Sequence, residues 1–166
     1  MICHYSSQNI KPIGRIWIAQ SKKGVCAISF NSSEKIFLDY LKKVLPEYVL
    51  IKKPLLNTFK RIDRYTGSKS IDLDLPFFFA SGTKFQKRIW NEIKKIPYGK
   101  TISYAELAKR AGHLRAFRAA ANACGKNPIP IIIPCHRVIA SNGSIGGFSS
   151  GVDIKRKLLN CEKLKK

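Results

Sequence analysis

The side chains best suited to chemistry in this sequence stand next to one another at Cys135, His136 and Arg137, directly after an isoleucine-rich run at 129–134. A cysteine in this place fits three roles: a small core residue, a metal ligand or a nucleophile. The adjacent histidine favours the nucleophile, because the thiolate is the reactive form of cysteine and imidazole accepts protons near neutral pH. We expect the isoleucine run to form a core strand that ends with Cys135 at the floor of a pocket.

The other cysteines form no pattern that competes with this interpretation. The chain has five cysteines, an odd number, and no pair with Cys-x-x-Cys spacing. Scattered cysteines of this kind predict reduced thiols rather than a disulfide framework. Cys3, His4 and Cys26 lack a further ligand at a recognisable metal spacing, so we predict neither a metal nor a cofactor.

Charge is the strongest feature of the composition. Lys and Arg number 31 against 10 Asp and Glu in 166 residues, a formal net charge of +21. Residues 81–166 carry 18 basic and 4 acidic side chains, so this half alone has a net charge of +14. Such a field attracts polyanions, nucleic acid above all, although lysine-rich proteomes also make proteins basic without a partner. We expect DNA to bind the second half.

The elements that position these residues fall into two units. In the first half, β-rich runs at 13–19 and 25–30 predict a hairpin, amphipathic patterns predict two helices, and alternation at 71–75 predicts a further strand. We therefore expect an α/β (α+β) fold. A small N-terminal mixed sheet-and-helix domain at 1–78, with a supporting role, precedes a mainly helical C-terminal domain at 79–166.

Helix signals in the second half predict a helix-turn-helix. Thr83 can cap one helix, and Ser103 with Glu106 forms a capping-box pattern at the start of a short helix at 104–110. A second helix is predicted at 114–124, after a glycine-containing turn. Two short helices joined in this way make a helix-turn-helix.

The second helix of this pair has an unusual composition. Five alanines leave one side almost without bulk, while Arg115 and Arg118 project. Alanine is also the best helix former and packs helices closely, which is the simpler explanation. Beside the positive charge and the helix-turn-helix, we favour a small face, including Ala119 and Ala120, that enters the minor groove of duplex DNA with an arginine among the bases.

The segment at 85–162 resembles the O6-alkylguanine-DNA alkyltransferases, also called methylated-DNA–protein-cysteine methyltransferases. The residues at 1–84 resemble the family only in length and coarse layout. The resemblance is carried in chain order by Ile102-Ser103-Tyr104, Arg118, Asn127-Pro128, the run from Pro134 to Val138, Gly143, Gly147-Phe148-Ser149, Leu158-Leu159 and Glu162.

The resemblance implies DNA repair by direct reversal of damage. The enzyme would transfer the methyl or other alkyl group of O6-methylguanine, with O4-methylthymine as a further candidate, irreversibly to Cys135 in a single turnover. The base must first leave the stack, because its O6 substituent is inaccessible inside a duplex. We expect a monomer that binds double-stranded DNA but no membrane, in the cytoplasm, associated with the nucleoid if the source is prokaryotic.

The resemblance also implies roles for particular residues. Cys135 would lose its proton through a water to His136, which Glu162 would orient in a Cys-His-acid triad. The water is expected because neighbouring residues on an extended strand point to opposite sides. Tyr104 would crowd the 3′ phosphate and donate a hydrogen bond to guanine N3, and Arg118 would fill the gap in the stack.

Recognition of the base is implied to rest on the backbone. The carbonyls of Cys135 and Val138 would accept from the exocyclic amine, the Ser149 amide would donate to O6, and Phe148 would flank the base. Asn127 would act as a structural hinge and not as a chemical group.

Two departures from the family pattern leave the range of alkyl groups open. Phe148 stands where a tyrosine is frequent, and Ser150 stands where glycine is common, so its side chain would narrow the pocket for groups such as benzyl. Three other functions fit less well. A lesion sensor of this fold would lack the cysteine, a Cys-His hydrolase gives Arg118 no role, and a helix-turn-helix regulator reads the major groove with polar side chains.

Overall fold

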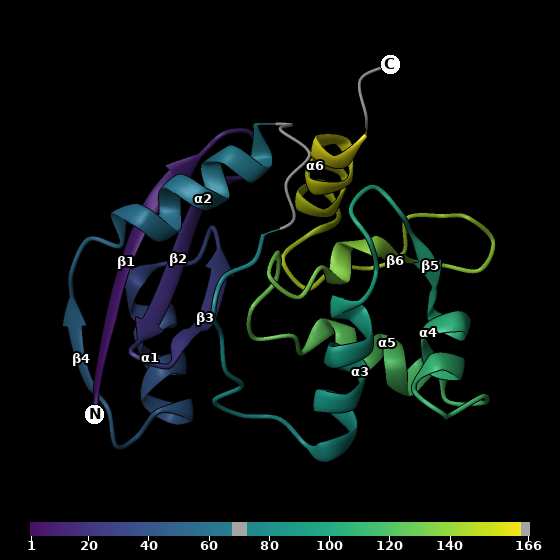
Figure 1. Ribbon diagram of the computed structural model, residues 1–166, viewed down its shortest axis with the longest axis horizontal. Coiled ribbons are helices and arrows are strands. Elements are labelled where there is room, and N and C mark those ends of the chain that lie inside the picture. Colours follow the sequence, from purple (N-terminus) through teal and green to yellow (C-terminus); the bar gives the residue numbers. More distant parts are fainter. Residues whose placement is uncertain (68–72, 164–166) are drawn as a thin grey trace.

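The computed structural model describes residues 1–67 and 73–163 of the chain. In these residues a four-stranded sheet with two helices forms one side of the molecule, and four helices with a small two-stranded sheet form the other (Figure 1). This is the mixed α/β class predicted from the sequence. No helix in the described residues is long and apolar enough to cross a membrane.

The large sheet has the order β3-β2-β1-β4. Its first three strands, β1 (Ile2–Ile10), β2 (Gly14–Ser21) and β3 (Gly24–Phe30), are antiparallel, and β4 (Val49–Lys52) runs parallel to β1. The predicted hairpin is confirmed as β2 and β3, whereas β1 and β4 were not predicted.

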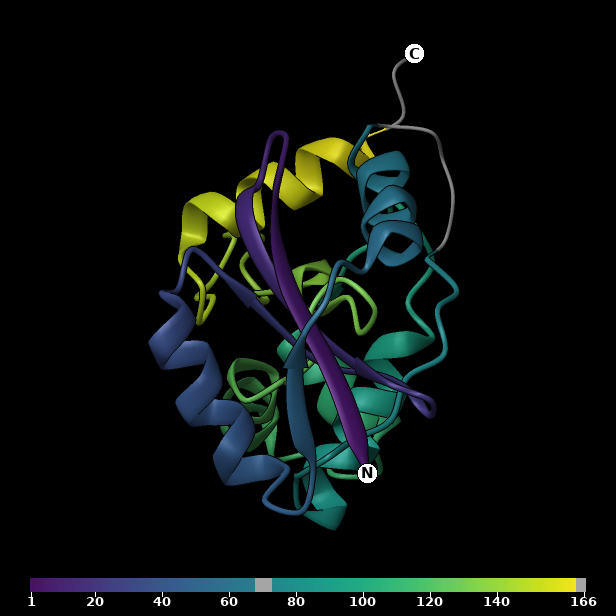
Figure 2. The ribbon, with the colours of Figure 1, turned by 90° about the vertical axis from the view of Figure 1, so that its left-hand side faces the viewer.

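Each face of this sheet packs against a different layer, because alternate side chains of a strand point to opposite faces. Helix α1 (Glu34–Val44), capped by Ser33, covers the face that buries Trp17. Helix α2 (Leu56–Thr66) and the second half of the chain cover the opposite face, which buries Ile16. Both helices confirm the amphipathic patterns of the sequence, and Figure 2 shows them at the two sides of the sheet.

The described part of the second half is mainly helical, as predicted. A short parallel pair of strands and a single 3-10 turn, η1, lie among its four helices. In chain order the elements are α3 (Lys84–Lys94), β5 (Ile102–Ser103), α4 (Tyr104–Arg110), α5 (Phe117–Gly125), η1 (Cys135–Arg137), β6 (Val138–Ile139) and α6 (Val152–Glu162).

Helix caps explain where α3 and α4 begin. Thr83 and Gln86 form a complete capping box at α3. At α4 only half of the predicted box is present: the Ser103 hydroxyl accepts from the Glu106 amide at 3.0 Å, while the Glu106 carboxylate pairs with Arg110 at 2.9 Å. Helix α5 begins at Phe117, three residues later than predicted, because residues 114–116 form a turn.

The prediction that a strand leads into Cys135 is wrong. The isoleucine run forms turns with one isolated bridge between Pro130 and Ile133, and Ile131 has a φ of +75°. The two prolines have no N–H to donate to a ladder, so the run cannot pair as a regular strand. It is buried nevertheless, and Cys135 begins η1 instead of ending a strand.

The strand predicted at 71–75 is also not confirmed. Residues 71 and 72 lie outside the described residues, and residues 73–75 have no regular structure. The segment that follows closes the edge of β3 instead: the Val25 amide donates to the Pro76 carbonyl at 2.8 Å, and the Phe78 amide donates to the Val25 carbonyl at 3.0 Å. A side chain at Gly24, whose φ is +117°, would meet this segment at 2.3 Å.

The predicted domain division at 78/79 stays a prediction. The larger core cluster joins side chains from both sides of it, such as Ile16 and Ile28 of the sheet with Trp90 and Leu158 of the helices. The Ile28 amide also donates to the Pro128 carbonyl at 2.9 Å. The second half of the chain is therefore supported directly by the sheet.

Candidate active site

Cys135 is the first residue of η1, and its side chain is 5% exposed. The Asn127 side-chain amide donates to Cys135 Sγ at 3.1 Å and to the Ile133 carbonyl at 2.8 Å, and Asn127 Oδ1 accepts from the Ile129 amide at 3.1 Å. Asn127 thus holds the turn that carries the thiol, as a hinge would. Its contact with the sulfur was not predicted, and its role as a structural hinge stays a prediction.

The electrostatic surroundings of Cys135 favour the thiol. Burial raises the pKa of Cys135 to about 11, although the hydrogen bond from Asn127 and the positive charge of Lys155 lower it. A thiol with this pKa is a weak nucleophile at neutral pH. The side chain therefore needs a base to become a thiolate.

His136 and Glu162 form a buried pair next to this thiol. His136 Nε2 lies 2.7 Å from Glu162 Oε1, and both side chains are almost fully buried. Burial lowers the pKa of His136, against the opposing effect of Glu162, so the imidazole is neutral. Beside an ionised carboxylate, Nε2 must carry the proton and Nδ1 the lone pair.

The Nδ1 atom of His136 is buried and has no hydrogen-bond partner among the described residues. A buried nitrogen of this kind is rare without a reason, because the missing hydrogen bond costs free energy. The predicted relay from Cys135 through a water to His136 stays a prediction. Cys135, His136 and Glu162 lie together, and no side-chain hydrogen bond joins the thiol to the imidazole in the residues described.

Glu162 is held by more donors than the sequence indicated. Arg137 Nε lies 3.0 Å from both carboxylate oxygens, the Gly99 amide donates to Oε2 at 2.9 Å, and the Tyr65 hydroxyl donates to Oε1. Burial alone would raise the pKa of Glu162, but the donors, with His136 first and Arg137 and Tyr65 after it, lower it to about 2. Glu162 is therefore an anion at neutral pH.

Lys155 is a further buried charge, and the sequence prediction missed it. Its Nζ donates to the Val138 carbonyl at 2.7 Å, the Gly147 carbonyl at 3.2 Å and the Tyr104 hydroxyl at 3.4 Å. The helical period could have revealed it, because Lys155 shares a face of α6 with the buried Leu158. Lys155 fixes the loop around the site and places a positive charge near the thiol.

A cavity of about 290 Å³ opens beside Cys135. This volume is at the lower end of the range of about 300–1,000 Å³ for small-molecule sites. Ser150 is not among the residues that line it, which does not support a narrowing by that side chain. The other lining residues are Tyr104, Ala121, Cys124, Gly125, Gly147, Phe148 and Ser149.

Tyr104 presents a neutral hydroxyl to this cavity. Burial first, and then the nearby Cys124 and Cys135, raise the pKa of Tyr104 to about 12. Its hydroxyl donates to the Gly147 carbonyl at 3.3 Å. The Val138 carbonyl, predicted to accept from the base, already accepts from Lys155 and keeps its second lone pair.

Some of the residues predicted to face DNA are exposed, and one of them is buried. Arg118 and Ala119 on α5 are exposed, and Arg115 is exposed in the turn before the helix. Ala120 is fully buried in the core, so the prediction that it contacts DNA is wrong. Phe117 is 48% exposed, and the Arg118 guanidinium lies 5.7 Å from its ring centroid.

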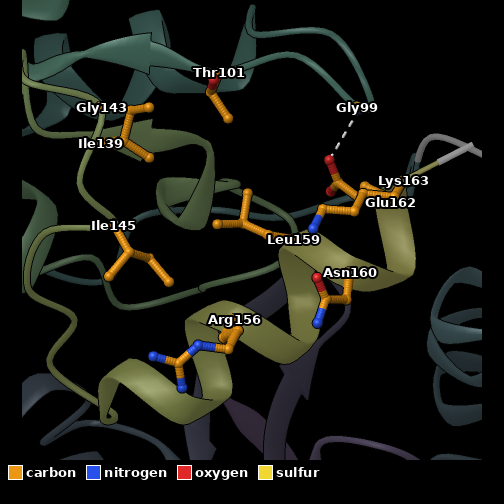
Figure 3. A pocket seen from close by; sticks show the side chains of 10 residues that line it. All are labelled: Gly99, Thr101, Ile139, Gly143, Ile145, Arg156, Leu159, Asn160, Glu162 and Lys163. Carbon is orange, nitrogen blue, oxygen red and sulfur yellow. Dashed lines mark hydrogen bonds between the residues drawn. The ribbon is translucent and has the colours of Figure 1, made fainter.

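Two further features lie apart from this arrangement. Cys3 and Cys26 place their sulfur atoms 3.8 Å apart in the sheet, yet no group of three His, Cys, Asp or Glu in the described residues is arranged to hold a metal. A second cavity, of about 300 Å³, lies beside α6 (Figure 3). Glu162 lies at its edge, bonded to Gly99, but Cys135 does not line it.

Known proteins are similar to this chain in sequence and in fold. The model of a family described as 6-O-methylguanine DNA methyltransferase, DNA-binding domain, matches residues 84–164. The chain is 39% identical to the methylated-DNA–protein-cysteine methyltransferase of Methanosarcina acetivorans, over 91% of this chain and 93% of that protein. The chain belongs to this methyltransferase family.

Other similarities extend over both halves of the methyltransferase. This chain is 34% identical to the Escherichia coli bifunctional transcriptional activator and DNA repair enzyme Ada, and the alignment covers 90% of this chain and 43% of that protein. The crystal structure of Mycobacterium tuberculosis OGT in complex with DNA has a TM-score of 0.81 at 31% identity, covering 96% of this chain and 92% of that one. The first half thus shares the fold of such a protein, and because the sequence alignment covers 91% of the chain, it includes most of the first half, contrary to the expectation of only a coarse resemblance there.

Proposed function

We propose that this chain repairs DNA by transferring the methyl group of O6-methylguanine to the sulfur of Cys135. Transfer to a cysteine of the protein follows from the family to which the chain belongs. The observation that supports Cys135 as the acceptor is its place at the cavity wall beside the buried His136 and Glu162 pair. Cys124 lines the same cavity, but burial raises its pKa further, and no base contacts it in the described residues.

The proton of Cys135 passes to His136 through a bridging water. Its acceptor is Nδ1 of His136, the nitrogen with a free lone pair, while Nε2–H stays bonded to Glu162. Asn127 and Lys155 stabilise the thiolate that forms, since both lower the pKa of Cys135. General base catalysis of this kind contributes about 10²–10⁴ in rate.

The transfer step replaces a carbon–oxygen bond with a carbon–sulfur bond. A lone pair of the thiolate attacks the methyl carbon, and the electrons of the breaking bond pass to O6 and the purine ring. Tyr104 donates a proton towards N3, so the base leaves as neutral guanine, and Lys155 stabilises the phenolate at 3.4 Å. The thioether product has no route back, so each molecule acts once.

The DNA partner is a duplex approached through its minor groove. Support comes from the net charge of +14 over residues 81–166 and from the exposed Arg118 on α5. Arg118 takes the place of the extruded base, and Tyr104 crowds the neighbouring phosphate. The pair α4 and α5 acts as the helix-turn-helix, residues 79–166 form the DNA-binding and transfer domain, and the protein works as a monomer.

The test is intact-protein mass spectrometry after incubation with a duplex that contains one O6-methylguanine, followed by peptide mapping. We expect one added methylene on Cys135 and an equal amount of repaired guanine. Cys135→Ala should bind the duplex without any mass gain, and Cys124→Ala should still accept the methyl group. Methylation of Cys135→Ala, or an unchanged mass of the wild-type protein, would refute the proposal.

A further inference from the structure

Tyr65 brings the first half of the chain into the proton relay. It lies on α2, and its side chain is 1% exposed. The C-terminal end of α2 lies beside α6 in both views of the molecule (Figures 1 and 2), which places Tyr65 next to residues 71 and 97 positions away in the sequence. Nothing in the role of a supporting domain requires such a contact.

The hydroxyl of Tyr65 contacts both members of the buried pair. It donates to Glu162 Oε1, and its oxygen lies 3.1 Å from His136 Nε2. The direction of the hydrogen bond is fixed, because burial and the charge of Glu162 raise the pKa of Tyr65, whereas Glu162 is ionised. Glu162 Oε1 is therefore shared between the Tyr65 hydroxyl and the His136 N–H.

The ring of Tyr65 is held in one orientation. It packs edge-on against Tyr98, with ring centroids 5.8 Å apart and an interplanar angle of 89°. The Tyr98 hydroxyl donates to the Cys161 carbonyl at 2.9 Å, one residue before Glu162. The hydroxyl of Tyr65 is therefore directed at Glu162 Oε1 by the packing of its ring against Tyr98, which is itself hydrogen-bonded to α6.

We infer that Tyr65 is a positioning residue of the methyl-transfer reaction, whose hydroxyl shares Glu162 Oε1 with His136 and so keeps the imidazole neutral with Nδ1 free to accept the proton of Cys135. This inference rests on the proposed function. The relay is complete only when α2 is docked against α6, so the first half of the chain takes part in the chemistry.

The physical reason lies in the competition for one oxygen atom. A carboxylate that accepts from Tyr65 has less electron density for His136 and stabilises the imidazolium less. Without the hydroxyl, Glu162 would favour protonated His136, which carries a hydrogen on Nδ1 and cannot accept another. Loss of Tyr65 should therefore move the protonation of His136 to higher pH.

Loss of the Tyr65 hydroxyl leaves the other charged groups around His136 in place. Burial lowers the pKa of His136, Glu162 raises it, and Arg137 and Lys155 lower it. Helix α3 also packs on η1, but its buried side chains are apolar. The groups that face His136 are Glu162 and Lys155 from α6, Tyr65 from α2, and Arg137 from η1 itself.

The experiment compares the full-length wild-type protein with Tyr65→Phe. Single-turnover transfer from the O6-methylguanine duplex is timed from about pH 5 to 8, the range in which histidine titrates. We expect the acid limb of the rate profile to move up by about one pH unit, so that transfer is about tenfold slower on that limb. The rate at high pH and the affinity for DNA should remain close to those of the wild type.

Tyr5→Phe is the matched control. The Tyr5 hydroxyl donates to the Glu34 carboxylate at 3.3 Å, also in the first half of the chain. Tyr5 belongs to the smaller core cluster under α1, whereas Cys135 belongs to the larger core cluster. This variant also loses one hydroxyl bonded to a glutamate, but its rate profile should superimpose on that of the wild type.

Nitrogen NMR of histidine-labelled protein provides a second measurement that needs no methyl transfer. The chain has 3 histidines, so the His136 signals can be assigned by one substitution. We expect wild-type His136 as the Nε2–H tautomer, with a titration midpoint that rises in Tyr65→Phe. A superimposable His136 titration, or a rate loss that is equal at every pH, would overturn the inference. Failure of the wild-type protein to methylate Cys135 would overturn the proposed function instead, and the NMR result would still decide the role of Tyr65.

Discussion

At the scale of the residue, the local environment sets the protonation states of three neighbouring side chains in the site. Burial keeps Cys135 a thiol and His136 neutral, while a set of donors keeps Glu162 ionised although it is buried. Arg137 supplies the opposite charge that such a carboxylate requires. These states are the ones that the proposed relay requires, with a thiol as proton donor and a neutral imidazole as acceptor.

The pKa of Glu162 predicts how stability depends on pH. Its folded value of about 2 lies below the usual 4.5, so the carboxylate contributes stability that is present above pH 4.5 and is lost as the pH falls towards 2. At about 1.4 kcal/mol per unit, the full contribution is about 3 kcal/mol. Glu162→Gln removes it and takes this carboxylate away from the buried Arg137.

Urea unfolding of the wild-type protein and Glu162→Gln at pH 7 and about pH 3 measures this contribution. We expect the variant to be less stable at pH 7, and the difference to shrink by about 2 kcal/mol at the lower pH. Glu106→Gln is the control, because the Glu106 side chain is partly exposed and pairs with Arg110 at the surface, where pairs contribute little. A difference for Glu162→Gln that does not vary with pH would contradict an ionised, paired Glu162.

At the scale of the element, local signals predicted the helices and the β2–β3 hairpin, but they missed β1 and β4 and wrongly predicted a strand before Cys135. Caps such as Thr83 and Ser103 act within one turn, so the sequence reveals them. Strands β1 and β4 depend on pairing with each other across the sheet, and the isoleucine run is buried without pairing at all. An apolar run indicates burial, but its periodicity does not tell whether it forms a strand.

The active site shows the same limit. Cys135, His136 and Glu162 could be predicted because a family motif and its spacing carry them. Tyr65 could not, since its partners are 71 and 97 residues away and only the packing of α2 on α6 brings them close. Asn127 was predicted, but its contact with the sulfur depends on how the turn at 129–134 folds.

The first turn of α5 carries a prediction for DNA binding. Phe117 is exposed beside Arg118, and Leu114 is 73% exposed in the preceding turn. An exposed aromatic ring next to a cation is suited to stacking on an unpaired base, which contributes about 1–3 kcal/mol. Arg118→Ala and Phe117→Ala should each slow repair of the duplex by about tenfold or more, while reaction with free O6-methylguanine changes little.

Timed transfer from the duplex and from the free base tests this prediction. Leu56→Ala is the control, because Leu56 is 73% exposed on α2, away from the proposed DNA surface. It should leave both rates unchanged. An equal loss on both substrates would mean that Arg118 or Phe117 shapes the cavity instead of the DNA contact.

At the scale of the whole molecule, one core connects the sheet to the reactive half. The larger cluster contains side chains of β2 and β3 together with those of α3, α5 and α6. The relay also needs Tyr65 from α2. The two halves therefore differ in composition and charge, but they share the interior that holds the active site.

The two tryptophans can report on whether these halves unfold together. Trp17 belongs to the smaller cluster under α1, and Trp90 to the larger one, where its indole donates to the Ala123 carbonyl at 2.8 Å. Trp17→Phe and Trp90→Phe each leave one fluorescent reporter. In each variant we expect the fluorescence transition in urea to coincide with the far-UV circular dichroism transition, as two-state unfolding requires.

Coincidence in both variants follows from the shared core, because opening either half exposes apolar surface of the other. The same experiment on Tyr65→Phe tests the coupling between the halves, since that variant loses a hydrogen bond across α2 and α6 but keeps the ring packing. In Tyr65→Phe the fluorescence and circular dichroism transitions should still coincide, but at a lower urea concentration than in the wild type. A Trp17 fluorescence transition at lower urea than the circular dichroism transition would instead show that the first half unfolds alone. Separation of α2 from α6 would then break the contacts of Tyr65 with Glu162 and His136 while the second half stays folded.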